Sequence, residues 1–235
     1  MTLAPPEVGA GAAATAVELA ATALTLARRF ASGATLWCVA PGRPAHARHV
    51  AVEFVHPVIV GKTALPAVAL TDGDPVALVR AAARRGDVVL VIGDANGAAV
   101  TELLRRAPAW GVLTLWLGAD ERPPPGAADH VNLVPGDCEV AVVRGYHLLW
   151  ELTHVCFEHP HVLAPPVPEA AACITCADEG RLGEVQEVRG TDASVLIDGE
   201  CETVDLGLVG DVGVHDLVIV HAGVAIERLD PGVGR

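Results

Sequence analysis

The pattern of the chain changes once, at a proline-rich stretch that follows residue 158. Before that point, apolar runs of strand length alternate with helical segments. After it, only short β runs separated by turns occur. The stretch itself reads EHPHVLAPPVP, which contains too many prolines to continue a helix and predicts a semi-rigid linker. This change constrains the fold most strongly, because it divides 235 residues into two domains of different architecture.

The first part, residues 1–158, predicts an α/β domain. The continuous apolar run from Val88 to Ile92 is typical of a strand covered on both faces, and Asp74 before Pro75 predicts a capped helix start. Repeated β-α-β order predicts a mainly parallel sheet with helices on both sides. The expected helices are 13–30, 44–55, one from residue 75, 97–107 and 138–158, and the expected strands are 35–40, 65–70, 88–92, 111–117 and 131–134.

The second part, residues 173–235, is expected to form a small β domain after a linker at residues 159–172. Asp198-Gly199 is a good hairpin turn. Several short strands in so short a segment predict a barrel with the shape of the oligonucleotide-binding fold. The expected strands are 181–189, 193–198, 201–206, 217–221 and 224–229.

The charge and cysteine content limit the function. A net charge of -13 gives the chain no electrostatic reason to bind nucleic acid or an anionic membrane. No apolar run is long enough to span a bilayer, and the N-terminal stretch lacks the basic region of a secretory signal, so we expect a cytoplasmic protein. In the cytosol, cysteines serve as thiols or ligands rather than disulfides. Four of the six are interpreted as packing residues: Cys38, Cys138, Cys156 and Cys201.

Two of the expected helices carry histidines and carboxylates along one face. Glu151-x-x-His154 has the spacing with which one helix supplies a carboxylate and an imidazole to a metal, and this ligand set suits Zn, Fe or Ni. The alternative is a pair of polar stripes, cross-linked by hydrogen bonds and salt bridges, at a subunit interface. The first stripe is His46, His49, Glu53 and His56, and the second is His147, Glu151, His154 and Glu158. The candidate metal ligands are His49, Glu53, His147, Glu151 and His154.

Three passages of the first domain resemble the phosphoheptose isomerase branch of the SIS (sugar isomerase) fold. They read ARHVAVEF from Ala47, PAVALTD from Pro66 and GDVVLVIG from Gly86, and the resemblance covers roughly residues 13–158. It implies an SIS-like parallel sheet and a homodimer or homotetramer. Some members bind zinc with residues from the helices that match these two, and His49, Glu53 and His154 fall on that pattern. The family's glutamine is not evident, because Arg144 or Tyr146 falls near its place.

The loop after residue 92 departs from that family. Phosphosugar binders of this fold place a Ser/Thr-rich loop around the phosphate, whereas this chain reads GDANGAA from Gly93. Asp94 adds a negative charge where an anion should lie, and like charges about 4 Å apart repel by roughly 4 kcal/mol at an effective dielectric near 20. Sugar-phosphate isomerisation is therefore not the expected activity.

The last third resembles the HypC/HupF family of hydrogenase maturation chaperones. It contains VIVHAGVAI from Val218 and a Cys173-Ile-Thr-Cys176 pair upstream, and the resemblance covers about residues 173–230. It implies a thiolate that holds an Fe(CN)2CO unit jointly with a HypD-like partner and delivers it to the hydrogenase large subunit. Cys176 is the candidate thiolate, Cys173 is the alternative or a second ligand, and His221 matches the family's histidine.

The cysteine pair has further interpretations. Its cysteines are internal, and Glu179-Gly180-Arg181 replaces the Pro-Gly turn of the family. The pair could instead be half of a zinc site completed by His159 and His161. We expect an accessory chaperone for [NiFe]-hydrogenase maturation. The alternative is a metal-dependent SIS-type isomerase or lyase with a regulatory β domain.

Overall fold

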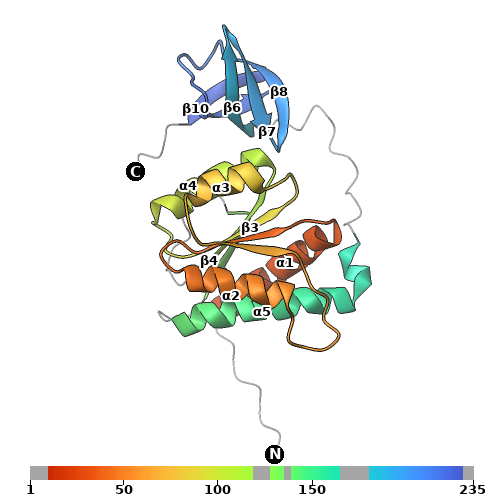
Figure 1. Cartoon of the computed structure of the whole chain (residues 1–235). Coiled ribbons are helices and arrows are strands. Elements are labelled where there is room, and N and C mark those ends of the chain that lie inside the picture. The colour runs from red at the N-terminus through yellow and green to blue at the C-terminus, as the bar shows by residue number, and fades with distance from the viewer. Residues whose placement is uncertain (1–9, 119–127, 135–138, 165–179, 230–235) are drawn as a thin grey trace, which may run out of the picture.

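The computed structural model describes residues 10–118, 128–134, 139–164 and 180–229. A parallel sheet with flanking helices is followed by a closed β-barrel, which confirms the expected fold (Figure 1). The sheet has the strand order β2-β1-β3-β4-β5. Its strands are β1 (Leu36–Val39), β2 (Ala67–Leu70), β3 (Val88–Ile92), β4 (Leu113–Gly118) and β5 (His130–Leu133). The flanking helices are α1 (Ala10–Ala31), α2 (Pro44–Val55), α3 (Pro75–Ala82), α4 (Ala98–Arg106) and α5 (Glu139–Glu158), with short 3-10 helices η1 (Ala107–Trp110) and η2 (Pro160–Leu163).

Two helix layers cover the two faces of the sheet. Successive side chains of each strand point to opposite faces, so each strand packs against both layers. Leu90 of β3 packs with α1, α2 and α5, whereas its neighbours Val89 and Val91 pack with α3 and α4. All five residues of β3 are buried, as the apolar run predicted. Asp74 caps α3 through its side chain, which accepts a hydrogen bond from the Val76 amide. Helices α2 and α5 lie side by side in the layer that also contains α1, and the site described below lies between them.

The start of the expected linker differs in the structure. Residues Pro160–Leu163 form η2, and the Val162 carbonyl accepts hydrogen bonds from Nε and Nη2 of Arg28 at 3.2 and 3.0 Å. The proline at the first position of η2 favours a helical turn, because its fixed φ suits that position. This turn therefore packs on the end of α1 and extends the α/β domain beyond residue 158.

The second domain is a closed five-stranded barrel with the order β10-β8-β7-β6-β9. The β7–β8 turn has φ values of 50° at Asp198 and 78° at Gly199, which a two-residue hairpin turn requires. Val185, Val195, Val218 and Val220 fill the interior. The strands are β6 (Arg181–Arg189), β7 (Asp192–Ile197), β8 (Glu200–Asp205), β9 (Leu217–His221) and β10 (Val224–Leu229).

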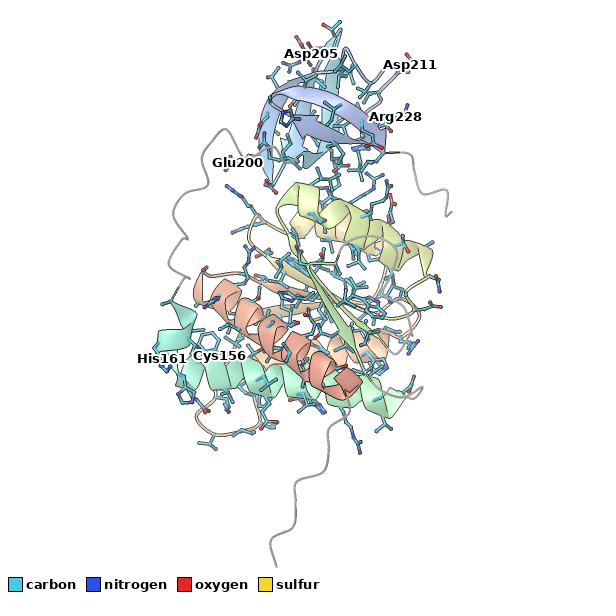
Figure 2. All side chains as sticks on the ribbon, turned by 180° about the vertical axis from the view of Figure 1, so that it is seen from behind. Cys156, His161, Glu200, Asp205, Asp211 and Arg228 are labelled. Carbon is cyan, nitrogen blue, oxygen red and sulfur yellow. The ribbon has the colours of Figure 1, made fainter. Side chains whose placement is uncertain are left out.

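The barrel lies on the α3 and α4 side of the α/β domain (Figure 1). Leu217 of the barrel belongs to the same apolar cluster as Trp110, and the Gly199 amide donates a hydrogen bond to the Ala109 carbonyl at 3.0 Å. Figure 2 shows Glu200 where the barrel meets the α/β domain, and this carboxylate pairs with Arg85. Within the described residues, none of the helices has the length and apolar character needed to cross a membrane.

Candidate functional site

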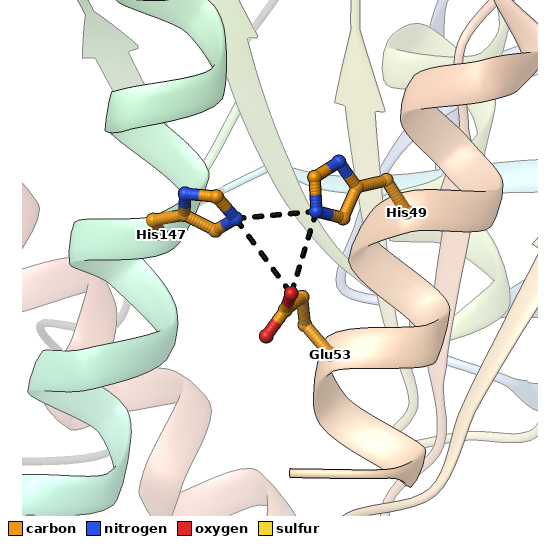
Figure 3. Close-up of side chains that lie close together, drawn as sticks. All are labelled: His49, Glu53 and His147. Atoms are coloured by element: carbon orange, nitrogen blue, oxygen red, sulfur yellow. Dashed lines mark hydrogen bonds and ion pairs between the residues drawn. The ribbon is translucent and has the colours of Figure 1, made fainter. Parts of the chain in front are cut away.

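Three polar side chains converge between α2 and α5 (Figure 3). Nε2 of His49 lies 3.2 Å from Nε2 of His147 and 3.3 Å from Oε1 of Glu53, and the His147–Glu53 separation is 3.8 Å. His49 and Glu53 are one helical turn apart on α2, so both face α5. The three side chains are 42%, 44% and 21% exposed for His49, His147 and Glu53, so the cluster is open to solvent on one side.

The geometry of this cluster fits a metal ion. Tetrahedral ligands about 2.1 Å from zinc lie roughly 3.4 Å apart, and the three observed separations bracket that value. Two imidazoles and one carboxylate form a common ligand set of catalytic zinc sites, which keep a fourth position open. Without an ion, two imidazole nitrogens at hydrogen-bond distance share a single proton between them.

Tyr146 orients one of the ligands. Its hydroxyl lies 3.0 Å from Nδ1 of His49, the ring nitrogen that faces away from the cluster. Burial, together with the charges of Glu53 and Glu139, raises the pKa of Tyr146 to about 12, so the phenol stays neutral. Its oxygen can then accept a hydrogen bond from the Nδ1–H group of His49. That tautomer leaves Nε2 of His49 free to ligate. The sequence places Tyr146 near the position of the family's glutamine but does not predict this hydrogen bond to His49.

The structure does not bring the other two candidate ligands to this cluster. His154 is buried, and its Nδ1 and Nε2 lie 2.9 Å from the Trp150 carbonyl and 3.0 Å from the Thr63 carbonyl. Glu151 is exposed and belongs to no described cluster of potential ligands. Residues 147, 151 and 154 share a helical face only approximately, and the rotation along α5 turns His154 into the core.

Zinc binding provides the first prediction. The His49→Ala/Glu53→Ala variant is expected to lose the ion, and Tyr146→Phe is expected to bind it about tenfold more weakly because the orienting hydrogen bond is absent. Affinity is measured by competition with a chromogenic chelator. Glu151→Ala is the matched control and should bind as the unaltered chain does. Equal affinity in the double variant and the control would refute the site.

The turn after β3 differs chemically from a phosphate loop. Oδ1 of Asp94 accepts a hydrogen bond from the Asn96 amide at 2.8 Å, so a carboxylate of the chain itself engages the backbone donor of this turn. Helix α4 begins at Ala98 after Gly97, which has no side chain to cap it. Asp94 is exposed, and a bound phosphate would have to lie against this charge. The turn therefore carries an exposed carboxylate where phosphosugar binders of this fold place hydroxyl groups.

The barrel positions His221 at the end of β9. Val220 pairs with Arg181, the first residue of β6, so the chain enters the barrel directly beside His221. Gly180 lies closely against β9, because a Cβ there would come within 2.5 Å of Ile219 Cγ2. His221 is half-buried. Cys173 and Cys176 lie outside the described residues.

The remaining cysteines and histidines divide by environment. Cys38 is buried in the core, where burial raises the pKa of its thiol, whereas Cys201 is exposed, so the packing interpretation is wrong for Cys201. On β8 only Val204 is fully buried, and the other side chains are exposed or partly exposed. Cys156 is half-buried, and Cys138 lies outside the described residues. His159 and His161 have ring centroids 5.9 Å apart.

A buried carboxylate between the two domains was not foreseen from the sequence. Glu184 of β6 is 1% exposed, and its Oε2 accepts hydrogen bonds from Trp110 Nε1 and from Arg80 Nε at 3.2 Å. Its Oε1 lies 3.4 Å from Arg106 Nη1 and 3.2 Å from His215 Nδ1. A glutamate in an alternating strand normally faces solvent, and the partners of this one in the α/β domain lie 74 to 104 residues away in sequence.

Comparisons with known proteins agree with both halves of the structure. Residues 181–233 match the HupF/HypC family, beginning five residues after Cys176. The chain is 33% identical over 175 residues to the phosphoheptose isomerase of Desulfovibrio desulfuricans, across 64% of this chain and 82% of that protein. A solved phosphoheptose isomerase from Francisella tularensis is 16% identical and superimposes with a TM-score of 0.52, covering 61% of this chain and 90% of that one.

The fold and these matches define a two-domain protein, an SIS-type α/β domain fused to a HupF/HypC-type barrel. Through its N-terminal region this chain belongs to the phosphoheptose isomerase family, and its C-terminal region is a HupF/HypC domain. Both resemblances identified in the sequence are thereby confirmed.

Proposed function

We propose that this chain is an accessory chaperone of [NiFe]-hydrogenase maturation, whose barrel holds an Fe(CN)2CO unit and delivers it to the hydrogenase large subunit with a HypD-like partner. The observation that carries the proposal is the HupF/HypC match over residues 181–233, which includes His221. In this proposal the Cys176 thiolate is the soft ligand for iron. Cys173 is its alternative or a second ligand.

The position at which the chain enters the barrel, at the start of β6, supports a role for Cys176 together with His221. Arg181 is five positions after Cys176, and an extended chain of that length reaches at most about 18 Å. Arg181 lies beside Val220 on the neighbouring strand, so this chain length limits how far Cys176 can be from the strand that carries His221. An imidazole near the thiol favours the thiolate or donates a hydrogen bond to a bound cyanide. Cys173 is three residues further away.

The α/β domain has a separate role in this proposal. The His49, Glu53 and His147 cluster lies between α2 and α5, whereas the barrel contacts α3, α4 and η1, so the sheet separates the two sites (Figure 1). The cluster therefore cannot ligate iron held by the barrel of the same chain. We propose that this domain binds Zn or Fe independently and forms a homodimer or homotetramer.

An enzymatic function is the second candidate. The similarity to a protein named phosphoheptose isomerase and the three-ligand cluster favour a metal-dependent isomerase or lyase regulated by the barrel. The Asp94 carboxylate at the β3–α4 turn argues against a sugar phosphate as its substrate. Turnover of a phosphoheptose by the metal-loaded chain, lost in His49→Ala/Glu53→Ala, would favour the enzyme and contradict this argument from Asp94.

Complementation tests the chaperone role in the cell. In a host strain that lacks this chain, hydrogenase activity is expected to return with the unaltered protein and to stay near background with Cys176→Ala, because no thiolate holds the iron. Cys201→Ala is the control, since it removes another accessible thiol and should restore activity fully. Equal activity in strains carrying Cys176→Ala and Cys201→Ala would contradict the proposed role of Cys176.

A further inference from the structure

Four arginines line a cleft at the amino ends of the central strands. Arg28 and Arg29 come from the last turn of α1, and Arg84 and Arg85 come from the loop between α3 and β3. The cleft has a volume of about 700 Å³. It lies at the sheet edge opposite the Gly93 turn, because that turn follows the carboxyl end of β3. It is therefore distinct from the position at which this fold binds phosphosugars.

The charge of the cleft contrasts with that of the chain. The protein carries a net charge of -13, yet four of its 16 lysine and arginine residues gather here. Asp87 is the acidic residue of the lining, and backbone and indole donors occupy both of its oxygens. Oδ1 accepts a hydrogen bond from the Thr35 amide, and Oδ2 accepts from Trp37 Nε1 and the Arg84 amide, at 2.8, 3.0 and 2.9 Å. Asp87 therefore lowers the positive potential without pairing with a guanidinium.

The four guanidinium groups differ in their partners. Arg28 donates to the neutral Val162 carbonyl, and Arg85 pairs with Glu200 of the barrel. Among the residues that the structure describes, the side chains of Arg29 and Arg84 make no hydrogen bond or ion pair. Nη1 of Arg29 lies 3.9 Å from where a Cβ at Gly86 would be, so the glycine leaves room beside this group. Two guanidinium forks thus remain available in a concave site.

The acidic groups near the cleft lie toward its far end. A shallower extension of about 260 Å³ shares Arg29 and Arg85 and is bounded by Asp129 and Asp198. Asp129 accepts hydrogen bonds from the amide and hydroxyl of Thr114, and Asp198 is exposed in the β7–β8 turn. The positive end is therefore the end between Arg29 and Arg84.

We propose that this cleft binds a small ligand that carries phosphate groups. Guanidinium forks match phosphate oxygens in pairs, and charge-assisted hydrogen bonds of this kind are the strong ones. A volume near 700 Å³ is in the range of small-molecule sites, and it accommodates a nucleotide as well as free pyrophosphate. A phosphate ligand between Arg29 and Arg84 would relieve the repulsion among the four cations.

Calorimetric titration with inorganic pyrophosphate and with ATP tests the proposal and distinguishes these two sources of phosphate. Removing two charge-assisted hydrogen-bonding groups is expected to weaken binding by at least about 30-fold in Arg29→Gln/Arg84→Gln. The control, Arg144→Gln/Arg189→Gln, removes the same charge from exposed positions outside the cleft and should bind as the unaltered chain does. Absence of binding by the unaltered chain at millimolar concentrations of both probes, or equal losses in the two variants, would overturn the proposal.

Hydrogen–deuterium exchange on the unaltered chain gives a second measurement that does not depend on the folding of a variant. Pyrophosphate is expected to slow amide exchange in residues 28–34 and 84–87, which form the cleft. Protection of residues 93–99 instead would assign the ligand to the opposite edge of the sheet and overturn the proposal.

Discussion

Replacing Glu184 by alanine is expected to lower the free energy of unfolding by about 3 kcal/mol, because it removes one partner from a buried ion pair network. Glu184 is 1% exposed, and its two oxygens hold Arg80, Arg106, His215 and the Trp110 indole together. Without the carboxylate, the buried indole N–H of Trp110 loses its acceptor. We choose the lower end of the usual range, since Arg80 is 34% exposed and regains water.

The same substitution is expected to change how the two domains unfold. This carboxylate of β6 contacts residues of α3, α4 and η1 in the α/β domain. Leu217 of the barrel also belongs to an apolar cluster of the α/β domain. In Glu184→Ala the barrel should unfold independently of the α/β domain, whereas the unaltered chain should unfold as one unit. Urea denaturation measures both effects, because the four tryptophans all lie in the α/β domain whereas circular dichroism reports on both domains, so the two transitions should coincide only in the unaltered chain.

Glu187→Ala is the matched control for that experiment. Glu187 lies on the same strand and pairs with Arg189 at 2.7 Å, but both side chains are exposed, at 56% and 70%. Exposed pairs of this kind contribute about 0 to 1 kcal/mol, so the control should unfold almost as the unaltered chain does. Similar losses in Glu184→Ala and Glu187→Ala would show that the interdomain carboxylate does not hold the domains together.

The fold could be predicted from the sequence where local patterns and packing agree. The apolar run of β3, the Asp74 cap and the Asp198-Gly199 turn each specify their own structure, and the structure contains all three. Residues 160–163 were harder, because proline content predicted a linker. The decisive contact there is a hydrogen bond between Arg28 and Val162, which are 134 residues apart in sequence.

The candidate site could be predicted only in part. Helical spacing placed His49 and Glu53 on one face, and the structure sets His147 of α5 beside them. Spacing along α5 could not decide which of its polar residues turns inward, and His154 binds core carbonyls instead. Glu184 and the arginine cleft carry no local signal, since both depend on loops and strands brought together by the tertiary fold.

The central claim is that the barrel holds iron that carries cyanide and carbon monoxide through Cys176. The most direct measurement is the infrared spectrum, in the cyanide and carbonyl stretching region, of the chain purified anaerobically with its HypD-like partner. The bands should be present with the unaltered chain and with Cys201→Ala. They should be absent with Cys176→Ala, because the methyl group of alanine has no atom that can ligate iron. Bands of equal strength in Cys176→Ala, or no bands in any complex that contains both proteins, would contradict the claim.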